Sequence, residues 1–307
     1  MLTSLTGLAP AGAVSATPDD YVTLVEVLDR LEVDYGTRVG ESDARSLAAR
    51  LGFDPGGVLD AGDVEWIRHL AGDLAALDRL EPTFAALGMG FGSMVDPTDA
   101  HNLARRLGVG VGQVVDRLDV DRLVAAGQAW VDHPPFARWR GVVLREPSPH
   151  VEVIGFHQSN HEGARDLEVL PTASRNVLLE SRGRLSGRRS AADVAIPVDH
   201  EIRSPITGTV LRSGTYALYC RYRDDYVVIR PDGPPGFELK ILHISGVRVG
   251  EGDRVMAAQT VLAPSPTPLP FHSQINDHTA LPRQPHVHVE LVDTSIPDIS
   301  NPNSGGC

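Results

Sequence analysis

Cysteine, lysine and long apolar runs are scarce in this chain. Of its 307 residues, two are cysteine and one is lysine. Neither cysteine lies in a C-x-x-C spacing, so the sequence does not favour a thiolate zinc site. No stretch approaches the roughly 18 to 20 consecutive apolar residues that a membrane-spanning helix needs, and we therefore expect no transmembrane segment.

Basic side chains are also few in the first part of the sequence. Residues 1–131 hold 10 of the 28 basic and 20 of the 40 acidic residues, which gives this part a formal charge of −10 out of −12. Binding to nucleic acid needs a basic surface that neutralises phosphates. The charge therefore argues against a nucleic-acid partner.

The first residues favour export. Residues 1–16 are mostly small and apolar and end in Ala-Val-Ser-Ala16, the small-residue pattern of a signal-peptidase site. The basic region and the longer apolar region of a signal peptide are missing. We expect residues 1–18 to be a signal sequence truncated at Met1, or else a disordered leader, in a secreted or cell-envelope protein.

The two cysteines allow one disulfide. A bond between Cys220 and Cys307 would attach the C-terminal tail, residues 297–307, to a strand, and it would agree with an oxidising compartment. The alternative is two unpaired thiols.

Residues 19–131 have helical spacing and contain an internal repeat. Residues 43–64 match residues 99–120 at 12 of 22 positions. We expect an acidic all-helical domain in which the two copies stack and bury apolar faces that neither copy hides alone. Its expected role is that of a spacer or of an interaction module for a protein partner.

Helix ends are predicted within each copy. Ser42 and Thr98 are expected N-caps, a Leu-Gly pair ends each helix, and Asp60 and Asp116 start the next ones. Residues 116–121 are rich in aspartate but lack the spacing of a calcium hand, so they predict helix caps rather than a calcium site.

The pattern changes after the helical half. Residues 132–149 begin with Asp-His-Pro-Pro, in which the two prolines force extended backbone and predict a linker. In residues 150–296, short runs rich in Val, Ile and Tyr alternate with Gly and Pro turns, which predicts a mainly antiparallel β domain. The expected fold class is α+β, with an all-helical domain followed by the β domain.

Nine of the twelve histidines lie in this β half. In the run 285–291, strand alternation places His286, His288 and Glu290 on one face and the aliphatic residues on the other. Two imidazoles on one strand face form half of a metal site or of an acid–base site. The alternative is a strand with surface histidines.

The β half resembles the sheet core of the lysostaphin-like zinc metallopeptidases in the order, spacing and turn residues of its segments. The resemblance covers about residues 185–295 and does not extend to the helical half. It is carried by residues 193–210, 226–229, 242–244, 247–255 and 285–290.

The resemblance implies a fold, a metal and a substrate class. The family binds zinc through a His-x-x-x-Asp motif and the second His of His-x-His, and its substrate is peptidoglycan. By position, Asp193 and His288 would be zinc ligands. His243 and His286 would orient or deprotonate the attacking water and stabilise the oxyanion.

One position departs from the family pattern. Arg189 stands where the first ligand His belongs, and a guanidinium has no lone pair for zinc. A different histidine then supplies the third ligand: His161 is the tentative choice, His157 its substitute and His200 a weaker option. Otherwise Arg189 pairs with Asp193 and the metal site is lost.

Two functions follow from these alternatives. With a complete zinc site, the protein is a metalloendopeptidase that hydrolyses peptide bonds of peptidoglycan, or of peptides outside the cell wall. With a degenerate site, it is a catalytically silent module that binds peptidoglycan peptides or regulates a partner hydrolase.

Overall fold

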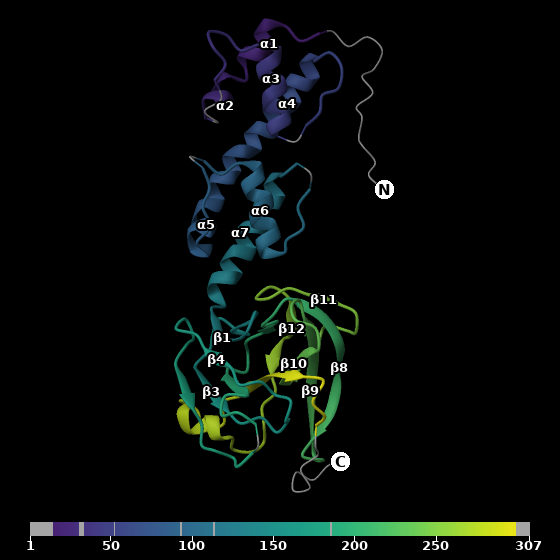
Figure 1. Cartoon of the computed structure of the whole chain (residues 1–307). Coiled ribbons are helices and arrows are strands. Elements are labelled where there is room, and N and C mark those ends of the chain that lie inside the picture. The colour runs from purple at the N-terminus through teal and green to yellow at the C-terminus, as the bar shows by residue number, and fades with distance from the viewer. Residues whose placement is uncertain are drawn as a thin grey trace. The chain divides into compact units, whose positions relative to one another are not determined.

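The structure is a computed structural model, and it describes residues 15–30, 34–51, 53–92, 94–112, 114–184 and 186–298 (Figure 1). The chain divides into two compact units, residues 1–128 and 129–307. Residues 1–14 and Cys307 lie outside the described residues, so the signal sequence and the disulfide stay predictions. Residues 15–18, which we assigned to the leader, instead join the helical unit, because the N–H of Ala16 donates to the carbonyl of Leu59 at 2.9 Å and the first helix begins at Pro18. None of the described helices combines the length and the apolarity needed to cross a membrane.

The first unit is built from helices. Their bounds are α1 Pro18–Val22, α2 Val25–Arg30, α3 Glu41–Arg50, α4 Ala61–Leu77, η1 Asp78–Leu80, α5 Glu81–Leu87, α6 Pro97–Leu107 and α7 Arg117–Asp132, the last of which continues into the second unit. Helices α3 and α6 begin two residues before the first and the second copy of the sequence repeat, and α4 and α7 begin inside these copies. The stacking of the two copies stays a prediction.

The helix N-caps differ in part from the prediction. Helix α3 follows Gly40, and α6 follows Asp96, whose carboxylate accepts a hydrogen bond from a backbone N–H of the first turn. Ser42 and Thr98 therefore lie inside the first turn, because the chain enters each helix two residues earlier than we expected. Gly108 ends α6 in the left-handed conformation, as predicted.

The predicted aspartate caps are present. Asp60 Oδ1 accepts a hydrogen bond from the N–H of Asp63, and Asp116 Oδ1 accepts one from the N–H of Asp119, both at 2.8 Å. These bonds satisfy N–H groups that have no partner within the helix. The aspartates near residue 116 thus have a capping role, as the sequence indicated.

The second unit is built from strands. Their bounds are β1 Pro135–Trp139, β2 Val142–Arg145, β3 Val153–His157, β4 Glu168–Val169, β5 Asn176–Leu178, β6 Ala191–Ala195, β7 Ile202–Arg203, β8 Gly208–Leu218, β9 Tyr222–Pro231, β10 Phe237–Ser245, β11 Arg254–Val255, β12 Val261–Ala263, β13 Ser265–Pro266 and β14 His286–Asp293, with the 3-10 helix η2 at Gln274–His278.

The main sheet has the strand order β11-β8-β9-β10-β14-β6-β3-β5, and β13 also pairs with β10. Every neighbouring pair is antiparallel except β3 and β5. Two smaller sheets are formed by β2-β1-β4 and by β12-β7. The described part of the chain therefore contains helices followed by a mainly antiparallel β domain.

Strands β1 and β2 lie in residues 132–149, for which we expected a linker. The two strands pair with each other, and Phe136 and Leu144 are fully buried in the main core of the unit. Burial of these apolar side chains explains why the segment packs as part of the β unit.

The central strands of the sheet have one apolar and one polar face. Val287, Val289 and Leu291 of β14 lie in the main core, which confirms the predicted alternation. The opposite face of β14 carries His286, His288 and Glu290. These three polar side chains therefore lie on the face of the sheet that is opposite the main core.

Strands β8 and β9 approach each other closely at Gly208 of β8. A Cβ added to Gly208 would collide with the backbone carbonyl of Arg230 on β9. We expect Gly208→Ala to lower the free energy of unfolding by about 1–3 kcal/mol, because backbone cannot move aside easily. Gly141→Ala, whose Cβ meets nothing within 4 Å, is the control. Urea denaturation measures both, and equal midpoints for the two variants would contradict the prediction.

Candidate metal centre

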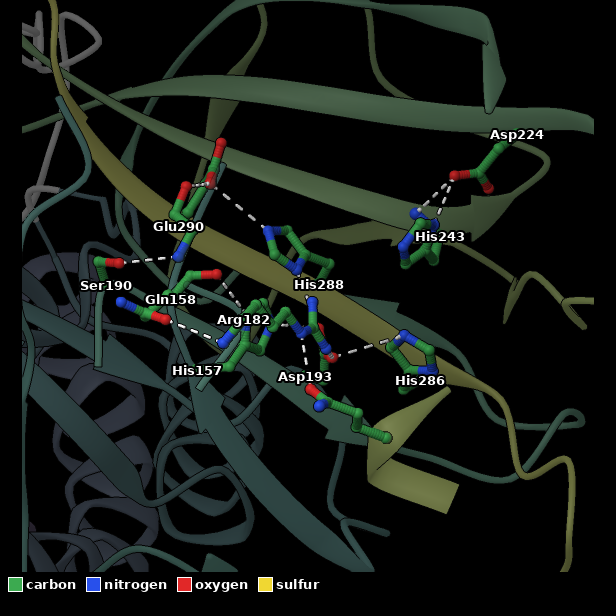
Figure 2. A network of polar contacts seen from close by, with 12 residues as sticks. His157, Gln158, Arg182, Ser190, Asp193, Asp224, His243, His286, His288 and Glu290 are labelled. Atoms are coloured by element: carbon green, nitrogen blue, oxygen red, sulfur yellow. Dashed lines mark hydrogen bonds and ion pairs between the residues drawn. The ribbon is translucent and has the colours of Figure 1, made fainter. Parts of the chain in front are cut away.

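Three neighbouring strands bring the candidate ligands together (Figure 2). In the antiparallel register, Asp193 of β6 lies opposite His288 of β14 on one side and opposite Gly155 of β3 on the other. Residues directly opposite share a face of the sheet, and so do residues two apart on one strand. His157, two residues after Gly155, therefore reaches Asp193 diagonally.

The three side chains converge on one point. Asp193 Oδ1 lies 2.9 Å from His157 Nε2 and 2.9 Å from His288 Nδ1. The three ligand atoms all lie within 4.8 Å of one another. His157 and Asp193 are almost completely buried, at 1% and 3% exposure. Two imidazoles and one carboxylate are a ligand set that zinc takes in catalytic sites.

One ring nitrogen of His157 is hydrogen-bonded to the backbone, and the other faces the carboxylate. Its Nδ1 lies 2.9 Å from the carbonyl oxygen of Gln158, which can only accept, so Nδ1 carries the proton. Nε2 is buried and has no hydrogen-bond partner, although it points at Asp193. A cation bound between Nε2 and the carboxylate would give both groups a partner. The donor set thus fits a bound metal ion.

His288 is held between two carboxylates. Its Nδ1 faces Asp193, and its Nε2 lies 3.5 Å from Glu290 Oε2. Burial alone would lower the pKa of His288, but its contacts with Asp193 and Glu290 raise the pKa to about 9. A carboxylate on the outer nitrogen of a ligand imidazole fixes the orientation of the ring.

Glu290 is itself buried and fully engaged. The hydroxyl of Ser159 donates to its carboxylate, and Lys240 Nζ lies 3.4 Å away from directly across the β10–β14 pair. Burial opposes ionisation, but His288, Lys240 and Ser159 together hold the pKa of Glu290 well below its usual range. Glu290 is therefore charged in the folded protein.

Two further histidines border the ligands. The ring centre of His243 lies 5.2 Å from that of His286 and 6.0 Å from that of His288. Burial lowers the pKa of His286 to about 4, so this imidazole is neutral at pH 7. Burial also opposes the ionisation of Asp193, but its contacts with His157 and His288 hold the pKa of its carboxyl well below its usual value.

An arginine from the segment after β5 also reaches the cluster. Arg182 lies 3.7 Å from Asp193 Oδ2, and its Nε donates to the side-chain oxygen of Gln274 at 2.6 Å. The segment that carries Arg182 is fastened by Gln158 (Figure 2), whose amide oxygen accepts the N–H of Arg182 and the hydroxyl of Ser181, both at 3.0 Å. Its amide nitrogen donates to the carbonyl of Arg184 at 2.7 Å.

The other candidate histidines lie apart from Asp193. His161 belongs to a separate group with Glu162 and Asp298, and its Nδ1 accepts the N–H of Gly163 at 2.9 Å. His200 stacks on another surface histidine instead. Position on the strand explains the difference, because His157 ends β3 whereas His161 follows in the loop. The geometry favours His157 over the tentative choice, His161.

Arg189 does not take the place of the missing histidine. Its side chain is exposed, and its backbone N–H donates to Asp166 Oδ1 at 2.6 Å. Within the described residues, Arg189 and Asp193 form no ion pair, and Arg182 is the arginine that lies beside Asp193. Closure of the site by Arg189, one of the two alternatives left open by the sequence, is therefore not what the structure shows.

The sequence did not point to several residues of this site. Asp224 accepts hydrogen bonds from His243, while Ser159, Lys240, Arg182 and Gln158 support the ligands or their loop. Gln158 and Ser159 lie between the candidate histidines 157 and 161, whereas Asp224, Lys240 and Arg182 lie in no motif with the histidines. Only the polar position of Lys240 in an otherwise apolar run marked a residue on this face.

Comparisons with known proteins give limited similarity. No family model matches the chain, and no curated protein matches it. Among solved structures, it is similar to LytU (20% identity, TM-score 0.28, covering 38% of this chain and 70% of that one). It is also similar to a zinc-containing peptidase from Vibrio cholerae (18% identity, TM-score 0.29, covering 54% of this chain and 39% of that one). A third similar structure is the catalytic domain of the prophage-encoded M23 protein EnpA from Enterococcus faecalis (20% identity, TM-score 0.25, covering 44% of this chain and 79% of that one). The functional argument therefore rests on the geometry of the cluster.

Proposed function

We propose that the β unit is a zinc metallopeptidase domain that hydrolyses peptide bonds of peptidoglycan. The observation that carries this proposal is the buried group of His157, Asp193 and His288, whose three ligand atoms lie within 4.8 Å of one another and include the unsatisfied Nε2 of His157. In this proposal, the ligand missing at Arg189 is replaced by His157 from the neighbouring strand.

Each residue of the site then has a defined task. Zinc, when bound, would polarise the scissile carbonyl and lower the pKa of water toward neutrality. His157, Asp193 and His288 would hold it, with Glu290 fixing the His288 ring. His286 is neutral at pH 7, as a proton acceptor must be, and His243 would share the handling of the proton and the oxyanion.

The substrate class, the location and the helical unit are further parts of this proposal. Peptidoglycan as the substrate, and a cell-envelope or secreted location, follow from the sequence resemblance. The helical unit, with its excess of acidic residues, would serve as a spacer or bind a protein partner.

A catalytically silent module is the second candidate. It is favoured by Arg182, whose guanidinium lies 3.7 Å from Asp193 and already places a positive charge beside the cluster. Such a protein would bind peptidoglycan peptides or regulate a partner hydrolase without cutting.

The zinc-to-protein ratio of the full chain separates the two candidates. We expect about one zinc per chain after purification without chelator, together with release of new amino groups from cross-linked peptidoglycan. Removal of zinc by a chelator should stop the release, and its return should restore it. A chain that takes up no zinc, or that holds zinc but cleaves no peptidoglycan peptide, would contradict the proposal.

Arg189 provides a further test of the ligand set. Because its side chain is exposed and forms no ion pair with Asp193 in the described part of the chain, we expect Arg189→Ala to keep the zinc content and the rate of hydrolysis of the wild type. Elemental analysis and an amine-release assay measure both. A substantial loss of zinc in Arg189→Ala would show that this arginine supports the site.

A further inference from the structure

His243 has an unusual backbone conformation. Its φ is +63°, a left-handed conformation that residues other than glycine rarely adopt. It lies in a bulge of β10, between Leu242 and Ile244, which pair with consecutive residues of β9. Glycine or asparagine would satisfy such a bulge more easily. The backbone conformation therefore does not explain why a histidine stands at this position.

The carboxylate of Asp224 contacts both the backbone and the ring of His243. Asp224 Oδ2 accepts the backbone N–H of His243 at 3.1 Å and lies 2.7 Å from its Nδ1 (Figure 2). The hydroxyl of Tyr216, opposite Asp224 on β8, donates to the same oxygen at 2.6 Å. Asp224 is only 2% exposed. The strained backbone is thus stabilised by the same group that orients the ring.

The protonation state of this pair follows from its hydrogen bonds. Burial opposes the ionisation of Asp224, but His243 and Tyr216 hold the pKa of its carboxyl below its usual value. An ionised carboxylate only accepts hydrogen bonds, so Nδ1 of His243 carries a proton. In the neutral ring, Nε2 then has a free lone pair. Nε2 forms no hydrogen bond with any other residue in the part of the chain that the structure describes.

We propose that Asp224 is a positioning residue that holds His243 in the Nδ1–H tautomer, so that Nε2 is the proton acceptor beside the candidate metal centre. An aspartate on the outer nitrogen of a catalytic histidine fixes the tautomer and the direction of the ring. The inference rests on the proposed peptidase function, and it adds a residue that lies outside the His-x-His motif. Asp224 does not touch the metal ligands and acts only through His243.

The tautomer is measured on the full chain labelled with ¹⁵N-histidine, with and without added zinc. In the wild type, we expect the long-range ¹H–¹⁵N spectrum to show a protonated Nδ1 and an unprotonated Nε2 for His243, assigned by comparison with His243→Gln. In Asp224→Asn, we expect this preference to be lost. A wild-type ring protonated at Nε2, or an unchanged tautomer in Asp224→Asn, would overturn the inference. The wild-type spectrum decides even if the variant does not fold.

The neighbouring aspartate gives a matched control. Asp225 accepts hydrogen bonds from Thr215 and from the N–H of Gly246, but it does not contact His243. We expect Asp225→Asn to keep the wild-type tautomer. Equal tautomer changes in Asp224→Asn and Asp225→Asn would mean that the bulge as a whole has shifted, and would also count against the inference.

Kinetics separate positioning from folding. We expect Asp224→Asn to lower kcat by about 10²- to 10⁴-fold, the range for loss of general acid–base catalysis, with KM and zinc content close to wild type. Loss of zinc in parallel with kcat would oppose the inference. If the tautomer responds as expected while wild-type protein cleaves no peptidoglycan, the inference stands and the proposed function fails.

Discussion

We expect His157→Ala to purify with almost no zinc and the wild type to purify with about one ion per chain. The reason is geometric, because His157 Nε2 is one of three ligand atoms and lies 2.9 Å from Asp193 Oδ1. Two remaining protein ligands bind zinc far more weakly than three. Peptide hydrolysis should be lost with the metal. Elemental analysis after dialysis, and titration with zinc, measure the effect.

His161→Ala is the matched control for this substitution. It removes another histidine side chain, four residues further along the chain, from a group that does not include Asp193. We expect its zinc content and activity to stay at the wild-type level. If His161→Ala loses the metal and His157→Ala keeps it, the tentative ligand of the sequence interpretation would be restored and the cluster would need a different explanation.

Glu290→Ala is expected to lower the free energy of unfolding by about 3–5 kcal/mol. Removal of one partner of a buried charge group leaves the others without compensation. Here the remaining groups are Lys240, His288 and the hydroxyl of Ser159. Urea denaturation in the presence of a chelator, followed by hydrogen exchange of amides in β10 and β14, measures the effect without a contribution from bound metal.

Two variants complete that experiment. Glu290→Gln keeps the shape and an acceptor for Ser159, so we expect it to lie between the wild type and Glu290→Ala. Glu168→Ala removes an exposed partner of Arg138 on β1 and should leave the unfolding curve unchanged. If Glu290→Ala unfolds at the same urea concentration as Glu168→Ala, the buried charges contribute nothing to stability.

The polar face of β14 could be predicted from the sequence. Strand alternation depends only on local periodicity, and it placed His286, His288 and Glu290 together opposite three aliphatic residues. The mainly antiparallel β domain was predictable for a similar reason, because short runs rich in Val and Ile between turns indicate strands wherever they occur.

The choice between His157 and His161 could not be made from the sequence. It depends on the register of β3 against β6, which brings Gly155 opposite Asp193 and thereby places His157 on the diagonal. Register is fixed by packing and by the connections between strands, and not by the residues of one strand. The pairing of Asp224 with His243 was hidden for the same reason, since it depends on a bulge in β10.

Gln158 links the chemistry of the site to the chain segment that encloses it. Its carbonyl orients His157, and its side chain holds Ser181, Arg182 and Arg184. An exchange of this segment with that of another protein would remove the partners of the Gln158 side chain and thereby release the ring of His157. The segment 181–184 and the ring of His157 therefore depend on each other. A change in the segment preserves the position of the ring only when the side-chain amide of Gln158 finds equivalent hydrogen-bond partners.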